Sequence, residues 1–161
     1  MSEFKELSLL FSEFRDARSV QHRRLALHVH RFTLALEDYL ALPSKFWTDH
    51  STGLNMQYVR LGVGGVNDFE EKAYFSLGGG NGAIDFSMAV TLESAPEAFP
   101  KVHHIFQFKV EALAGGVEFT CSDFEGAFGV GDGEDALHLY ESLCGAVVSS
   151  LRNIYDVSRV L

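Results

Sequence analysis

The first forty residues carry a helical pattern that is longer than a small sheet can cover. Apolar side chains recur every three or four residues, at Phe4, Leu7, Phe11, Phe14, Leu25, Phe32, Ala35, Tyr39 and Leu42. Pro43 disfavours helical geometry at the residue before it, so the helix should end near Leu42. At about 1.5 Å per residue such a helix is about 60 Å long, whereas a strand of about ten residues spans about 33 Å. The helix must therefore break or extend beyond the sheet.

Polar side chains interrupt this apolar stripe midway. The steps without an apolar residue are occupied by Arg18, Gln21 and His28. Arg18 and Gln21 fall at about the point where an underlying sheet would end. Two outcomes stay open: a helix that breaks near residues 18–24, or a continuous helix whose halves pack on different partners. Three further basic residues project away from the stripe and are expected on the solvent face: Arg23, Arg24 and Arg31.

If the helix is continuous, its N-terminal half presents an apolar stripe to water, which predicts a partner. A symmetric homodimer is the commonest solution, and residues 1–17 would form its projecting arm. The predicted dimer interface comprises Phe4, Leu7, Leu10, Phe11, Phe14, Arg18 and Gln21.

The rest of the chain predicts an antiparallel sheet followed by a helix. Residues 83–92 alternate strictly between apolar and polar or small side chains, and further strands are predicted at 54–63, 71–77, 102–113, 116–122 and 126–130. Short turn-like connections favour a meander. A helix is expected over 134–157, with Asp132 as its cap and Glu134 and Asp135 at the positive end of its dipole. The predicted fold class is α+β: a long N-terminal helix, a five- or six-stranded antiparallel meander and a C-terminal helix, with both helices on one sheet face.

Size and charge narrow the class of protein. The chain of 161 residues predicts one domain over 1–161. Its net charge of −9 is concentrated in residues 51–145, which carry fourteen acidic and four basic side chains. Such a surface repels nucleic acid and anionic membranes, so neither is expected as a partner. The chain lacks a signal-peptide pattern and any apolar run long enough to span a bilayer, so a cytoplasmic location is expected.

The sequence predicts no catalytic, metal-binding or cofactor-binding residues. The glycine clusters at 62–65, 78–82 and 129–133 are interpreted as turns and a helix cap, because the last one runs into acidic residues that would repel phosphate. His103 and His104 are adjacent in a strand and face opposite sides. Cys121 and Cys144 are expected as free thiols. Residues 47–51 place Asp, His and Ser together, and a structured loop packed by Trp47 explains them better than a catalytic triad.

Two functional hypotheses follow. In shape and charge the chain resembles bacterial secretion chaperones and toxin-immunity proteins. The first hypothesis is a non-catalytic, homodimeric protein-binding module whose acidic surface engages a basic protein, and the predicted partner surface comprises Glu118, Asp123 and Glu125. The alternative is a small-ligand-binding protein or enzyme with an aromatic pocket between the sheet and the C-terminal helix. The predicted lining of that pocket is Phe86, His104, Phe106, Phe108 and Phe119.

Overall fold

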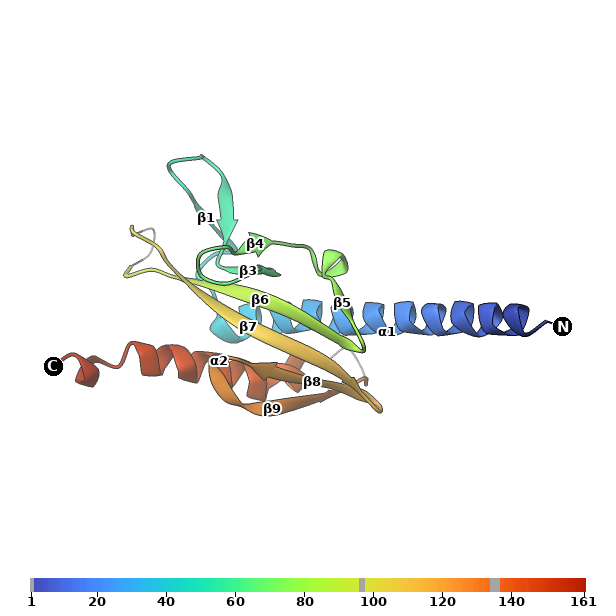
Figure 1. Ribbon diagram of the computed structural model, residues 1–161. Helices are drawn as coiled ribbons and strands as arrows, with labels where there is room; N and C mark the ends of the chain where they lie inside the picture. Colours follow the sequence, from blue (N-terminus) through green and yellow to red (C-terminus); the bar gives the residue numbers. More distant parts are fainter. Residues whose placement is uncertain (1, 96–97, 134–136) are drawn as a thin grey trace.

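Two helices pack on one face of an antiparallel sheet in the computed structural model, which describes residues 2–95, 98–133 and 137–161 (Figure 1). The helices are α1 (Glu3–Leu40) and α2 (Glu141–Ile154). The strands are β1 (Phe46–Thr48), β2 (Asn55–Gln57), β3 (Val59–Val63), β4 (Glu70–Glu71), β5 (Gly79–Gly80), β6 (Ala83–Leu92), β7 (Val102–Leu113), β8 (Gly116–Cys121) and β9 (Phe124–Gly131). Helix α1 contacts β3, β6 and β7, and α2 contacts α1 and β9. The α+β class and the placement of the helices are confirmed.

The main sheet has seven strands in the order β4-β3-β6-β7-β8-β9, and β5 pairs with β6. Strands β6 to β9 are neighbours in both sequence and space, which confirms the meander for this part. The predicted number of strands was too low, because residues 54–63 divide between two sheets: β2 pairs with β1, whereas β3 pairs with β6. The predicted strand at 71–77 is also wrong, since a 3-10 turn occupies Tyr74–Ser76.

Helix α1 is continuous, so of the two outcomes that the sequence left open, the break near residues 18–24 does not occur. The Ser2 side chain caps its start by accepting a hydrogen bond from the Lys5 amide at 3.3 Å. It ends at Leu40, where Ala41 adopts a left-handed conformation with φ of 48°. Its buried residues all lie in the second half, between Leu25 and Leu36. Figure 1 shows the first half projecting beyond the sheet.

An aromatic cluster fills the core between the helices and the sheet. Phe32 of α1 lies edge-on to Phe108 and Phe119, with ring centroids 5.2 Å and 5.5 Å away. Tyr140, just before α2, stacks on the other side of Phe32 at 6.4 Å. Burial of each such ring contributes about 1.5–3 kcal/mol, so this cluster fixes the second half of α1 on the sheet.

The segment before α2 differs from its prediction. A 3-10 turn at Leu137–Tyr140 leads into α2, and Tyr140 takes the N-cap position without a side-chain capping bond. Asp132 is therefore not the helix cap. Strand β9 extends to Gly131 and carries Asp132 to α1, where it contacts Arg24 and His28. The predicted dipole residues 134 and 135 lie outside the described part of the chain.

Candidate functional site

The first half of α1, Glu3–Val20, is called the arm below. None of its residues is buried, and the structure describes all of them. Six large apolar side chains on it are between 60% and 77% exposed: Phe4, Leu7, Leu10, Phe11 and Phe14 on the side of the stripe, and Val20 on another side of the helix. Four of these continue the three- and four-residue steps that are buried further along α1 at Leu25 and Phe32. The arm thus displays the same kind of surface that the sheet covers elsewhere.

Arg18 and Gln21 mark the place where the arm leaves the sheet. The Arg18 guanidinium donates to the Gln21 side-chain oxygen at 2.7 Å and lies 5.2 Å from the centre of the Phe14 ring. Both polar side chains lie against the tip of the β5–β6 hairpin, where a Cβ on Gly82 would lie 3.2 Å from the guanidinium. These two residues therefore lie where the sheet ends, as their positions in the sequence predicted.

The third interruption of the stripe, His28, has a structural role in the core. His28 is 2% exposed, its Nε2–H donates to the Asp132 carboxylate at 2.8 Å, and its Nδ1 shares a hydrogen bond with the Tyr140 hydroxyl at 2.7 Å. Arg24 also pairs with Asp132, so its predicted place on the solvent face is wrong. The hydrogen bond from His28 is the main reason why the pKa of Asp132 lies below its ordinary value, and Arg24 lowers this pKa further. Arg23 is exposed as predicted, whereas Arg31 is half-buried.

The three residues of the predicted partner surface all belong to the β8–β9 hairpin. Glu118 lies mid-strand opposite Glu111 and is half-buried. Asp123 occupies the exposed turn and accepts a hydrogen bond from the Gln107 amide at 3.2 Å. Glu125 is exposed on β9. Asp123 and Glu125 thus lie at or next to the turn, whereas Glu118 pairs with Gly129 further along the hairpin, and the binding role of the three residues stays a prediction.

The predicted aromatic pocket residues lie mostly in the core. The four phenylalanines are at most 3% exposed and are surrounded by ring contacts: Phe86, Phe106, Phe108 and Phe119. His104 lies apart from them, hydrogen-bonded to the Tyr155 hydroxyl, and partial burial lowers the pKa of its imidazole. These contacts use the rings as packing between sheet and helices.

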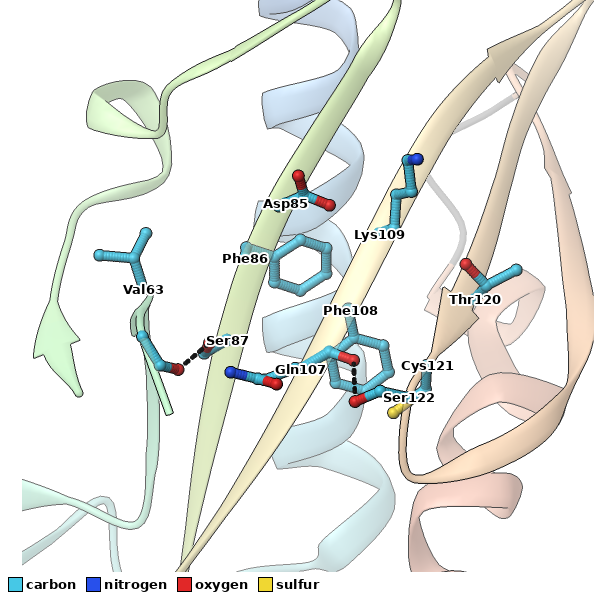
Figure 2. Close-up of a pocket in the computed structure, with 11 residues that line it drawn as sticks. Val63, Asp85, Phe86, Ser87, Gln107, Phe108, Lys109, Thr120, Cys121 and Ser122 are labelled. Carbon is cyan, nitrogen blue, oxygen red and sulfur yellow. Dashed lines mark hydrogen bonds between the residues drawn. The ribbon is translucent and has the colours of Figure 1, made fainter. Parts of the chain in front are cut away.

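A cavity of about 540 Å³ lies on the sheet face opposite α1 (Figure 2). Its polar lining comes from β6, β7 and β8, and includes Asp85, Gln107, Lys109 and Thr120. The Ser87 hydroxyl donates to the Gly64 carbonyl at 2.5 Å, so toward a ligand it can act only as an acceptor. The cavity therefore offers mixed polar groups, and it lies on the other side of the sheet from the predicted pocket.

The groups considered for catalysis have structural partners. Burial raises the pKa of the Cys121 and Cys144 thiols to about 12, so neither is an activated nucleophile. The Ser51 hydroxyl donates to Asp49 at 2.7 Å, while the His50 ring contacts Phe99 instead, with centroids 5.0 Å apart. Over residues 2–95, 98–133 and 137–161, no three His, Cys, Asp or Glu side chains gather closely enough to hold a metal ion.

Trp47 lies just before the loop that contains Asp49 and Ser51, and the Phe99 ring contacts both the indole, at 6.1 Å between centroids, and the His50 ring of that loop. That Trp47 itself packs the loop stays a prediction. The indole is 9% exposed and stacks on His103 with centroids 5.9 Å apart. Beside it, Lys101 forms an ion pair with Glu93 and lies 5.6 Å from the centre of the indole ring. The Lys101 bond is the largest influence that lowers the pKa of Glu93. Trp47, Glu93 and Lys101 also line a cavity of about 300 Å³ at this end of the molecule.

Comparison with known proteins adds no assignment, since no protein-family model, curated protein or solved structure matches the chain. Within the described residues, both helices fall short of the combination of length and apolar character that crossing a membrane requires. Among the surfaces described above, the arm is the one whose exposed side chains are of a kind that proteins normally cover.

Proposed function

We propose that the protein is a non-catalytic protein-binding module that forms a homodimer through its arm. The observation that supports this proposal is the exposed stripe of Phe4, Leu7, Phe11 and Phe14 on a helix whose continuation is packed into a core. A second copy presents the same stripe, so in a symmetric dimer each stripe would cover the apolar surface of the other.

The size of the stripe fits a modest but specific interface. If each of its five apolar side chains lost about 100 Å² on pairing, two copies would bury about 1,000 Å², near the lower limit for a specific interface. Area alone does not set the affinity of an interface, because association also costs translational, rotational and side-chain freedom. The area is compatible with a dimer, and contacts beyond the stripe would strengthen it.

The proposed partner of the dimer is a basic protein that binds the acidic β8–β9 hairpin. Residues 51–145 carry fourteen acidic and four basic side chains, a net charge of −10. Two of the acidic groups on the hairpin, Asp123 and Glu125, are exposed. Opposite charge on a partner would raise its association rate and favour it over other proteins. A chaperone-like or immunity-protein-like role fits this proposal by shape and charge alone.

The dimer is tested by the double variant Phe4→Asp with Phe11→Asp. We expect light scattering to give twice the monomer mass for the wild type and the monomer mass for the variant, because two carboxylates per copy would enter an apolar contact. Leu9→Asp is the matched control, since Leu9 is 55% exposed and lies about 200° around the helix from Phe11. A monomeric wild type, or a double variant that keeps the dimer mass, would refute the proposal.

The partner surface is tested by reversing its charges. The triple variant with Lys at Glu118, Asp123 and Glu125 should bind a fluorescent lysine-rich peptide more weakly than the wild type in anisotropy measurements at low salt. The control reverses three other exposed acidic residues and so makes the same change in net charge: Asp38, Glu70 and Glu71. Equal weakening in both variants would mean that net charge, rather than this hairpin, attracts the peptide.

A second candidate function is small-ligand binding at the open-face cavity. The observation that favours it is the volume of about 540 Å³, which lies within the ordinary range of ligand sites. Gln107→Trp would fill this space from an exposed position on β7. Ligand-observed NMR against a fragment collection should then lose any hits that bind there, and an absence of hits on the wild type would count against the candidate.

A further inference from the structure

The base of the arm borders a groove of about 480 Å³ that the chain's own side chains leave open. One wall is α1, with Phe14, Arg18 and Gln21, and the other is the β5–β6 hairpin. Asn81 and Gly82 have φ values of 57° and 75°, as a two-residue hairpin turn with left-handed central residues requires. Gly79, Gly80 and Gly82 add no side chains to this wall, whose other lining residues are Asn81 and Ala83.

We infer that the two arms pair antiparallel and that the first turn of each arm occupies the groove at the base of the other. This inference rests on the proposed homodimer. It adds the direction in which the two arms pair, their register, and a second contact at the groove. The occupant of the groove is thus the residue stretch around Phe4 of a second copy.

The apolar steps select one antiparallel register. The steps along the stripe alternate between three and four residues, so the stripe has two kinds of position: Phe4 and Phe11 are one kind, and Leu7 and Phe14 are the other. In an antiparallel pair of helices, a residue of one kind faces a residue of the other kind on the partner. When Phe4 of one copy faces Phe14 of the other, Leu7 faces Phe11, and both contacts occur twice by symmetry. Every layer is then apolar. Arg18 and Gln21 fall just outside the paired length and remain beside the groove.

Leu10, which lies beside the stripe, is accounted for by the same register. On the flank of an antiparallel pair it would meet Leu10 of the second copy, and Ser8 would meet Ser8 on the other flank. In a parallel pair Leu10 would instead lie next to Arg15 of the partner. The antiparallel arrangement therefore covers an exposed leucine that the parallel one leaves beside a charge.

Charge also favours the antiparallel direction. Residues 3–6 carry two Glu and one Lys, a side-chain charge of −1, whereas residues 15–24 carry four Arg and one Asp, a charge of +3. An antiparallel pair places each acidic tip near the basic base of the other copy. A parallel pair would bring the two basic segments together.

Helix geometry directs Phe4 toward the groove. Side chains on a helix lean toward its N-terminus, so the Phe4 ring of one copy extends past Phe14 of the other in the direction of Arg18. The two Gln21 residues would be separated by 24 helical positions, or about 36 Å. The two sheets therefore stay clear of each other while both grooves are filled.

The direction is tested by the distance between two spin labels at Ala17→Cys in a Cys121→Ser, Cys144→Ala background. The antiparallel register separates the two positions by about 24 Å along the helices, whereas a parallel pair holds them about 10 Å apart. Pulsed electron resonance distinguishes these distances. A dimer with the short distance would overturn the inference but leave the proposed dimer standing, and a monomer would overturn both.

The groove contact is tested by Gly80→Phe, because a Cβ at Gly80 meets no atom within 4 Å and the ring would enter the groove. Gly78→Phe is the matched control, since its Cβ is equally unobstructed but Gly78 does not line the groove. We expect the dissociation constant of the dimer to rise about tenfold or more for Gly80→Phe and to change little for Gly78→Phe. Equal dimer affinities for both variants would refute occupation of the groove.

Discussion

Removing the Asp132 carboxylate should destabilise the fold chiefly by leaving His28 without its acceptor. In Asp132→Ala the Nε2–H of His28, whose side chain is 2% exposed, loses a hydrogen bond of 2.8 Å. A buried donor left unsatisfied costs about 1–3 kcal/mol, and the partly exposed Arg24 pair adds at most about 1 kcal/mol. A total of about 2 kcal/mol corresponds to a fall in melting temperature of about 4–8 °C for a chain of this size.

Urea unfolding at pH 7 and pH 3.5 measures this effect and its origin. Folding lowers the pKa of Asp132, so its stabilisation is complete above the unfolded-state pKa of about 4 and is lost as the pH falls through the lower folded-state pKa. The difference in free energy of unfolding between the wild type and Asp132→Ala should therefore be smaller at pH 3.5 than at pH 7. Glu125→Ala removes an exposed carboxylate from β9 that has no buried partner among the described residues to leave unsatisfied, so it should change the free energy of unfolding by less than about 0.5 kcal/mol. The reasoning would be refuted if Asp132→Ala lowered the free energy of unfolding by less than about 0.5 kcal/mol, or if its effect on that free energy were the same at both pH values.

Two further predictions concern buried ionisable groups. Glu93→Gln should lower the free energy of unfolding by about 1–2 kcal/mol in urea titrations, because the Lys101 ammonium and the Tyr58 hydroxyl would lose a charged acceptor; an effect within error of the wild type would contradict this. Cys121 and Cys144 should react with a thiol-specific disulfide reagent at pH 8 much more slowly in the native protein than in urea, because burial raises the pKa of both thiols to about 12; equal rates would contradict it.

Periodic patterns predicted the long elements well. Strict alternation over 83–92 gave β6 with its bounds, and the three- and four-residue steps gave α1 to within two residues of its end. These patterns are reliable because each side chain position follows directly from the repeat of the backbone. The short elements failed for the opposite reason, since β4 and β5 have two residues each and carry no measurable period.

The candidate site was predicted in part. The sequence located Arg18 and Gln21 at the end of the sheet because their positions could be measured along a helix of known rise. It did not find the groove, which depends on the β5–β6 hairpin folding back against α1. The Asn81-Gly82 pair was a local signal for that hairpin. No local sequence pattern encoded how closely this hairpin approaches α1.

The sequence by itself determined the α+β class, the C-terminal end of α1 and the apolar stripe of the arm, because these depend on local periodicity and on size. Tertiary structure decided that α1 is continuous and which polar residues of that stripe are buried. His28 became part of the core because Asp132 and Tyr140, more than a hundred residues away, supply its hydrogen bonds. Arg18 and Gln21 remained at the surface because the sheet ends beneath them. One helical pattern thus has a covered half and an uncovered half, and the extent of the sheet sets the boundary between them.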